Sequence, residues 1–278
     1  MKIKAADHII FHHIPKTAGT TLYSIIDNSF SGKVYTINGN QTEHDDSKKE
    51  FSGLPQNVID SIDLLKGHRT YGMDRLFSGT VKYLTILRKP AQRHISGYYQ
   101  ILKVKPELKE RIEFVKSPPS LEEYVRMGDI YYGKNPQLKT FLNIPDPTVE
   151  VNDEMLTVAL KIIKDQYFHV GLTEEFDRTC IILNQYEGFN IEKYLKRNVA
   201  NNYDRTKISD NLINLYNKIH SYDVIFYDEV RKIFEGEWDK VINGEELLDK
   251  FQKKNRKWNR QFLLKENIKR VVKKIIRR

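Results

Sequence analysis

The stretch His13-Ile-Pro-Lys-Thr-Ala-Gly-Thr-Thr21 decides how this chain is interpreted. An apolar run at 9–14 leads into it and predicts a strand ended by Pro15, and the pattern at 20–29 predicts a helix that opens directly after the turn. A strand that passes through a tight turn into a helix presents backbone N–H groups and the positive end of the helix dipole to an anion. The stretch therefore predicts a cradle for a phosphate-like group.

Side chains in the same stretch strengthen this prediction. Gly19 lets the backbone approach a ligand closely, and Lys16 adds a mobile positive charge. Three hydroxyls can also donate hydrogen bonds, those of Thr17, Thr20 and Thr21. The sequence is not a Walker A motif, because no Gly-Lys-Ser/Thr closes it and Lys16 precedes Gly19 by three residues. The alternative interpretation is an ordinary strand-to-helix turn with a solvent-facing lysine.

A second strand-to-helix junction lies further along the chain. The apolar run at 83–87 predicts a buried parallel strand, and Pro90 stands at the first position of a helix predicted over 90–103. Arg88 lies at the carboxyl end of this strand, and Ser96 falls about two turns into the helix. An arginine offers two donors in a fixed fork, which suits a phosphate. The alternative is a strand-end arginine paired with a surface acid.

Strand-like and helix-like runs alternate along the rest of the chain, which is typical of an α/β fold with a mostly parallel sheet flanked by helices. Polar and turn residues at 38–57 predict a surface excursion. Further elements are predicted by the same patterns: strands at 33–37 and 169–172, a capping box at Ser120-Leu-Glu-Glu123, and helices at 152–166, 176–186 and 208–234. The C-terminal half is expected to be helix-rich and to cap the sheet.

Both junctions resemble motifs of one family. Pro15-Lys-Thr-Ala-Gly-Thr-Thr21 resembles the 5′-phosphosulfate loop of sulfotransferases that use 3′-phosphoadenosine 5′-phosphosulfate, in particular the membrane-type carbohydrate family that includes the heparan sulfate 2-O- and 6-O-sulfotransferases. Arg88-Lys-Pro90, with Arg93 and Ser96, is similar to that family's 3′-phosphate site, although the family usually has Asp where Lys89 stands. The resemblance implies a P-loop-like sulfotransferase fold, in a soluble member of the kind found in bacteria. It implies co-substrate contacts at Pro15, Lys16, Thr17, Ala18, Gly19, Thr20, Thr21, Arg88 and Ser96.

The resemblance also gives roles to residues outside the two motifs. His68, in Lys66-Gly-His-Arg69, matches the histidine that takes the proton from the acceptor hydroxyl, and a neutral imidazole suits this role near pH 7. A lone histidine is otherwise most often a satisfied structural group. Weaker matches are Arg69, Asn135 and Gln137 as acceptor contacts, Arg205 in a loop that closes over the nucleotide, and Val170-Gly-Leu-Thr-Glu174 as a following strand.

The remaining titratable groups do not predict other chemistry. His8, His12 and His13 have no carboxylate or cysteine at metal-ligand spacing, so we expect them to line a strand and expect no metal. Cys180 is the only cysteine, which excludes an internal disulfide and favours a reducing compartment. The N-terminal apolar run is too short for a secretory signal, and no apolar stretch reaches the length of a spanning helix.

The expected function is therefore transfer of a sulfuryl group from 3′-phosphoadenosine 5′-phosphosulfate to a hydroxyl of a carbohydrate or glycolipid acceptor. His68 would act as the base, and Lys16 would neutralise charge on the leaving phosphate oxygen. Two alternatives stay open. A small-molecule kinase on a P-loop core would need a lysine after the glycine and an acidic magnesium ligand, and a membrane-tethered, non-catalytic nucleotide-binding protein would not need His68.

Charge divides the chain into a body and a tail. The 278 residues carry 40% hydrophobic and 30% charged residues, so a globular core is expected. Thirteen of the 46 basic and one of the 37 acidic residues lie in 250–278, which gives that segment +12 and leaves 1–249 at −3. We therefore expect a sulfotransferase domain at 1–249 and no nucleic-acid-binding face on it.

The tail has the pattern of a basic amphipathic helix. Six apolar residues recur at helical spacing while lysines and arginines occupy the other faces: Leu264, Ile268, Val271, Val272, Ile275 and Ile276. Such a helix either docks on the body or lies on an anionic membrane surface. The second interpretation predicts a cytoplasmic protein held peripherally at the inner membrane face, close to lipid-linked saccharides.

Overall fold

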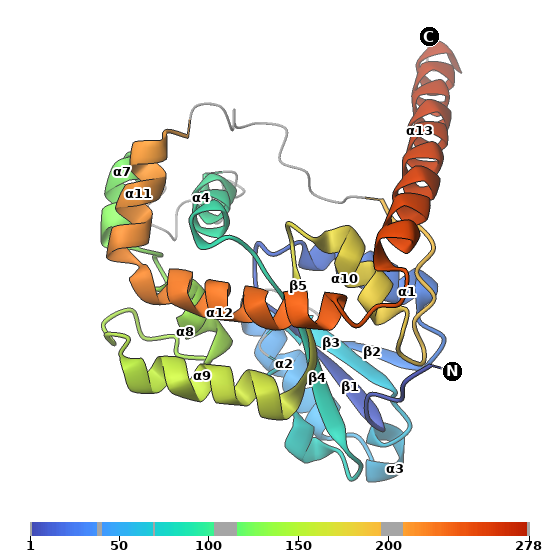
Figure 1. Ribbon diagram of the computed structural model, residues 1–278, viewed down its shortest axis with the longest axis horizontal. Helices are drawn as coiled ribbons and strands as arrows, with labels where there is room; N and C mark the ends of the chain where they lie inside the picture. The colour runs from blue at the N-terminus through green and yellow to red at the C-terminus, as the bar shows by residue number, and fades with distance from the viewer. Residues whose placement is uncertain (1, 38–40, 69, 103–115, 196–207, 277–278) are drawn as a thin grey trace.

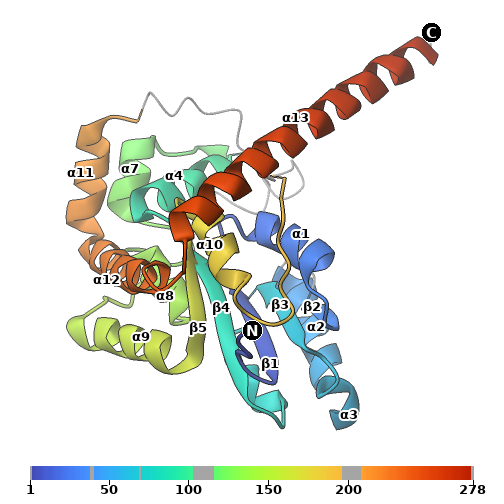
Figure 2. The same ribbon diagram turned by 45° about the vertical axis from the view of Figure 1, so that its right-hand side comes forward.

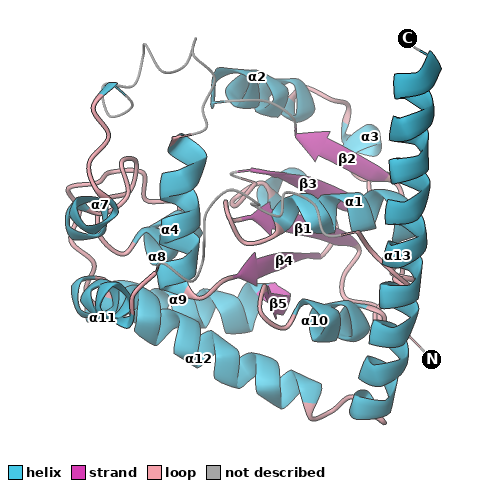
Figure 3. Cartoon of the chain, turned by 90° about the horizontal axis from the view of Figure 1, so that it is seen from above, coloured by secondary structure: helices cyan, strands magenta, loops and turns pink. Residues whose placement is uncertain are grey.

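A five-stranded, all-parallel sheet forms the centre of the molecule (Figure 1). The computed structural model describes residues 2–37, 41–68, 70–102, 116–195 and 208–276. The strands are β1 (His8–His13), β2 (Val34–Ile37), β3 (Leu64–His68), β4 (Val81–Leu87) and β5 (Tyr167–Leu172). Their order across the sheet is β2-β3-β1-β4-β5, and Figure 3 shows β2 at one edge and β5 at the other. All the carboxyl ends therefore meet at one edge, where α/β folds bind ligands.

Helices surround this sheet and form most of the C-terminal half. In chain order they are α1 (Gly19–Ser29), α2 (Gln41–Ser52), α3 (Gln56–Ile59), the 3₁₀ turn η1 (Asp74–Leu76), α4 (Pro90–Ile101), α7 (Leu121–Met127), α8 (Pro136–Phe141), α9 (Asp153–Gln166), α10 (Phe176–Leu183), α11 (Asp210–Ile219), α12 (Ser221–Trp238) and α13 (Gly244–Ile276). Helices α9, α10 and α12 pack along β5, so the later part of the chain covers that edge of the sheet.

Local signals in the sequence set several helix boundaries. Pro90 occupies the first turn of α4, where its missing N–H costs nothing. The predicted capping box forms at α7: the Ser120 side chain accepts from the Glu123 N–H, and the Glu123 carboxylate accepts from the Ser120 N–H. The side chain of Asn152 likewise caps α9 by accepting from the Met155 N–H.

The fold class predicted from the sequence is confirmed, with three corrections to its elements. The interval 38–57 is not a plain surface excursion, because α2 and the start of α3 lie within it and Phe51 on α2 is fully buried. Strand β3 was not predicted, because Lys66 and Gly67 interrupt its short apolar run. The helix predicted over 208–234 is divided at His220 into α11 and α12.

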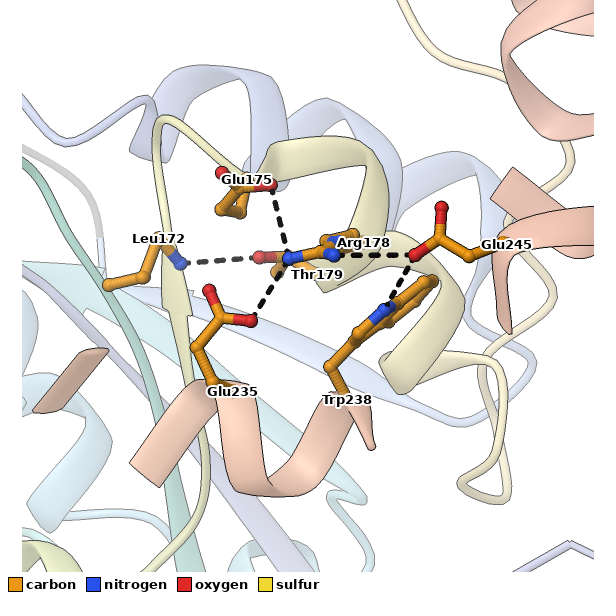
Figure 4. Close-up of polar contacts among 7 residues, drawn as sticks. All are labelled: Leu172, Glu175, Arg178, Thr179, Glu235, Trp238 and Glu245. Carbon is orange, nitrogen blue, oxygen red and sulfur yellow. Dashed lines mark hydrogen bonds and ion pairs between the residues drawn. The ribbon is translucent and has the colours of Figure 1, made fainter. Parts of the chain in front are cut away.

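The first part of helix α13 packs against the body, and the rest of the helix projects away from it. At its start, Arg178 of α10 lies 3.1 Å from a Glu235 carboxylate oxygen and 3.3 Å from Glu245, and Trp238 Nε1 donates to the same Glu245 carboxylate at 3.1 Å (Figure 4). Further along, Phe251 is buried against the body, whereas the far half of the helix projects beyond the rest of the fold (Figures 1 and 2). The predicted boundary at residue 250 thus falls inside one continuous helix.

Candidate active site

The turn between β1 and α1 has a strained backbone. Lys16 and Ala18 have φ angles of 71° and 66°, in the left-handed region that residues with side chains seldom adopt. The fully buried Thr17 between them donates from its hydroxyl to the Ile14 carbonyl at 2.7 Å, which ties the turn to the strand end. Strain of this kind persists only where the surroundings hold it, and it is concentrated at ligand sites.

Helix α1 begins directly at this turn. Ala18 occupies its N-cap and supplies no side-chain cap, so the N-terminal N–H groups are not covered by a capping oxygen from that residue. An anion bound here would take the place of the missing cap and would meet the positive end of the helix dipole. The Lys16 ammonium group lies beside the turn and donates to Gln100 Oε1 at 3.3 Å.

Two arginines from the second junction hold the carbonyl groups of the turn. Arg88, at the end of β4, donates from Nη1 to the Lys16 carbonyl at 3.2 Å. Arg93, in the first turns of α4, donates from Nε to the Pro15 carbonyl at 3.1 Å and from Nη2 to the Thr140 hydroxyl at 3.2 Å. The two motifs predicted separately from the sequence are therefore one structural unit.

Arg88 retains donor capacity in this arrangement. Its Nε is buried and has no hydrogen-bond partner among the residues that the structure describes. Ser96 lies in α4 at 9% exposure, on the inner side of the helix. Together with the uncapped turn, these groups fit a ligand that carries anionic groups at two points, as the expected nucleotide co-substrate does.

A carboxylate supports the start of α4 from a different strand. Glu174, just after β5, accepts from the Lys89 N–H at 3.0 Å and from the Tyr227 hydroxyl at 2.8 Å. The related family usually has Asp at the position of Lys89; here Glu174, from the end of the neighbouring strand, accepts from the N–H of the N-cap residue itself. Glu174 therefore holds the start of α4, although Lys89 offers no capping oxygen of its own.

His68 ends β3 next to the strand that enters the turn. His68 and His13 are direct partners in the β1–β3 register, and their rings stack with centroids 4.1 Å apart and planes at 29°. His68 is half-buried, whereas His13 is buried at 7% exposure. Burial is the main cause that lowers the pKa of His13 well below its usual value of 6.5, with smaller contributions from the charges of His68, His12 and Lys16.

An ion pair between a buried lysine and an exposed aspartate adjoins the two histidines. The Lys66 side chain is 2% exposed and pairs with the Asp27 carboxylate of α1, and its ammonium group lies 5.1 Å from the centre of the Tyr23 ring. The Tyr23 ring in turn meets the His13 ring edge-on at 5.0 Å. This cluster fixes α1 to β3 and therefore fixes the turn relative to His68.

The segment predicted to contact the acceptor is used inside the protein. The Gln137 side chain is fully buried and exchanges two hydrogen bonds with the backbone of Arg88, at 3.3 and 3.0 Å. Asn135 is 5% exposed; its N–H donates to His220 Nδ1, and its Oδ1 accepts from the Asp223 N–H. Buried Asp223 accepts from the Gln137 and Leu138 N–H groups at 3.0 and 2.8 Å. This geometry favours a positioning role for Asn135 and Gln137 over contact with an acceptor.

Two residues predicted for the site, Arg69 and Arg205, lie outside the described residues. Among the described residues, no group of three or more His, Cys, Asp or Glu could hold a metal ion. Sequence reasoning gave no role to Glu174 and Asp223, although a carboxylate next to a predicted strand or helix end is the signal that could have suggested capping.

The chain was compared with protein families and with solved structures. A family model described as "Sulfotransferase family" matches residues 1–229. Among solved structures, the chain is similar to mouse sulfotransferase SULT7A1 complexed with PAP, with 11% sequence identity and a TM-score of 0.43 over 89% of this chain and 90% of that chain. No curated protein matches the chain.

Proposed function

Because the chain belongs to the sulfotransferase family, we propose that it moves a sulfuryl group from 3′-phosphoadenosine 5′-phosphosulfate to a hydroxyl of a carbohydrate or glycolipid acceptor, with His68 as general base. The observation that carries this proposal is the stack of His68 on His13, because His13 is the last residue of the strand that enters the donor turn. A base at this place would lie close to the group that the turn is proposed to bind.

The residues of the donor turn support the binding half of the proposal. The N-terminus of α1 and the Lys16 ammonium group would hold the phosphosulfate end, and Arg88 with Ser96 would hold the 3′-phosphate. The co-substrate supplies an activated sulfuryl group on a phosphate leaving group. Transfer of this kind needs little covalent help from a protein beyond placement in line and neutralisation of charge.

Specific groups would take the proton of the acceptor hydroxyl and stabilise the charge on the leaving phosphate oxygen. The acceptor O–H proton moves to the imidazole of His68 as the acceptor oxygen forms its bond to sulfur. The bond between sulfur and the bridging phosphate oxygen breaks, and Lys16 and the turn N–H groups stabilise the charge that develops on that oxygen. No side chain needs to form a covalent intermediate.

The test compares His68→Ala with wild type. We expect turnover to fall by about 10²–10⁴ while the affinity for adenosine 3′,5′-bisphosphate stays within a few-fold by calorimetry. Turnover close to wild type would exclude His68 as the base. Calorimetry with ATP and magnesium in place of the bisphosphate tests the kinase alternative, and mass spectrometry of glycans and glycolipids incubated with enzyme and donor tests the acceptor class.

We also propose that α13 attaches the protein to an anionic membrane surface. Four exposed basic residues share one face of the helix at i, i+3, i+4 and i+7: Lys253, Arg256, Lys257 and Arg260. The opposite face is docked, because Phe251 is buried and Asn255 Oδ1 accepts from the Tyr194 N–H at 2.9 Å. One turn beyond the basic face, Leu263 and Leu264 are 57% and 63% exposed.

A helix with a cationic face and exposed leucines fits the headgroup region of an anionic bilayer. Among the described residues, no helix is long and apolar enough to cross a membrane. Attachment by α13 would bring the donor site close to lipid-linked saccharides, which supports a membrane-bound acceptor.

A further inference from the structure

We propose that His13 is a positioning residue that couples the donor turn to His68. This inference rests on the proposed function, in which the turn holds the donor and His68 is the base. The sequence analysis expected His13 to line a strand. In the structure, the His13 ring contacts both the start of α1 at Gly19 and the ring of His68.

One side of the His13 ring lies on the first residue of α1. A Cβ atom built on Gly19 would lie 1.8 Å from His13 Nε2 and 2.0 Å from Cδ2. Such distances are far below van der Waals contact, so the ring occupies the space that any side chain at this position would need. Gly19 is therefore required by packing against His13, since its backbone angles do not themselves demand glycine.

The other side of the ring meets His68. The stacking distance of 4.1 Å leaves no room for a further group between the two imidazoles. Phe11, two residues earlier on β1, stacks on His13 at 5.6 Å, and Tyr23 closes its edge at 5.0 Å. A ring enclosed in this way cannot shift without moving either the start of α1 or His68.

Three aromatic rings pack against the faces and the edge of the His13 ring. The buried Nδ1 of His13 has no hydrogen-bond partner among the described residues. Burial keeps the ring neutral near pH 7, because the pKa of His13 is lowered well below 6.5. A neutral spacer adds no second positive charge beside His68 when His68 takes the acceptor proton. The shape of the ring is therefore the property that the site uses.

A series of substitutions separates ring shape from imidazole chemistry. His13→Phe keeps a flat ring, and we expect its turnover to stay within about threefold of wild type. His13→Ala removes the ring, and we expect turnover to fall about 10- to 100-fold through misplacement of His68. His12→Gln is the matched control, because His12 is adjacent on β1 but lies 2.7 Å from the Tyr167 hydroxyl, away from Gly19. Thermal melting checks that each variant is folded.

A double variant tests the contact with the turn directly. Gly19→Ala alone forces the His13 ring out of place and should weaken binding of adenosine 3′,5′-bisphosphate about tenfold or more. His13→Ala combined with Gly19→Ala removes the overlap and should recover most of that loss. If the double variant binds no better than Gly19→Ala alone, the contact does not set the geometry of the turn.

The decisive measurement is NMR of the histidine rings in ¹⁵N-labelled protein. In wild type and His13→Phe, adding adenosine 3′,5′-bisphosphate should shift the ring resonances of His68, and in His13→Ala this shift should fall to less than half. An equal shift in His13→Ala would overturn the coupling. If His13→Phe were as inactive as His68→Ala, His13 would act chemically and the positioning role would be wrong. If instead His68→Ala kept its turnover while the NMR coupling was observed, the proposed base would fail and this inference would stand.

Discussion

Gln137 and the backbone of Arg88 exchange two hydrogen bonds: the Arg88 N–H donates to Gln137 Oε1 at 3.3 Å, and Gln137 Nε2 donates to the Arg88 carbonyl at 3.0 Å. Gln137 lies in the first turn of α8, where the N–H groups of Gln137 and Leu138 donate to the buried Asp223 of α12. The end of β4 is therefore fixed from outside the sheet, at the residue that would bind the 3′-phosphate. Helices late in the chain thus set the position of an arginine that the sequence alone places only at a strand end.

This contact predicts that Gln137→Ala weakens binding of the donor nucleotide. Leaving the buried Arg88 backbone groups unpaired costs about 1–3 kcal/mol, part of which should appear as weaker binding of adenosine 3′,5′-bisphosphate by calorimetry. Gln185→Ala, in the turn after α10, is the control, because its side chain bonds locally, to the Ile181 carbonyl. An increase in the acceptor KM with unchanged nucleotide affinity would instead restore the sequence prediction that Gln137 contacts the acceptor.

Substitutions of the two arginines of the second junction should have different effects, one mainly on stability and the other mainly on nucleotide affinity. Arg93 is 4% exposed and holds the Pro15 carbonyl, so Arg93→Met leaves buried acceptors unpaired and should lower the free energy of unfolding by about 1–3 kcal/mol. Arg88→Ala should change stability less but weaken binding of the bisphosphate by about 2–5 kcal/mol, through loss of a charge-assisted pair. Urea unfolding and calorimetry on both variants measure the two effects. Unchanged bisphosphate affinity in folded Arg88→Ala would exclude Arg88 from the 3′-phosphate site.

The sequence predicted the two junctions because their signals are local. Pro90 at a helix start, Gly19 in a turn and apolar runs before each of them depend only on neighbours along the chain. Strand β3 was missed because Lys66 reads as a surface residue. Its burial depends on Asp27, which lies 39 positions away on α1 and becomes its partner only once the sheet has formed.

The supporting carboxylates could not be predicted for a similar reason. Glu174 caps the start of α4 only because β5 lies beside β4, and Asp223 holds α8 only because α12 crosses it. Each contact joins residues more than 80 positions apart. Asn135 and Gln137 were assigned to the acceptor because their segment resembles one that lies near the acceptor in the related family, whereas the structure buries both.

Buried histidines predict loss of stability in mild acid. His220 is fully buried, and burial lowers its pKa from 6.5 to about 4. Between pH 6.5 and about 4, His220 therefore binds a proton in the unfolded chain but not in the folded chain. The contribution of His220 to the free energy of unfolding is therefore fully present above pH 6.5 and is lost as the pH falls toward 4. At about pH 5, His220 alone should cost roughly 2 kcal/mol relative to neutral pH.

The variant His220→Gln isolates this contribution. Glutamine can still accept from the Asn135 N–H and donate to the Val125 carbonyl, as the imidazole does at 3.0 and 2.9 Å. Urea unfolding near pH 7.5 and pH 5 should show a difference about 2 kcal/mol smaller in the variant than in wild type. The same difference in both proteins would show that His220 does not carry the acid sensitivity.

The last prediction concerns α13. Each basic residue near an anionic membrane contributes about 1 kcal/mol of attraction, so replacing the exposed face should release the protein from vesicles. The variant carries Lys253→Gln, Arg256→Gln, Lys257→Gln and Arg260→Gln. These positions face away from the body, so the docking contacts of Phe251 and Asn255 are retained, which deletion of all of 250–278 would remove. We expect sedimentation with phosphatidylserine-containing vesicles to fall at least tenfold, while sulfation of a small soluble acceptor is unchanged.

Two controls make this result specific. The double variant Lys161→Gln and Lys164→Gln removes exposed charge from α9 and should still sediment, because those lysines lie on a different helix. Wild-type protein should stay in the supernatant with vesicles of phosphatidylcholine alone and should leave phosphatidylserine vesicles as salt is raised, since screening weakens exposed charges. If wild type fails to sediment with anionic vesicles even at low salt, α13 does not bind membranes and the argument for a lipid-linked acceptor falls with it.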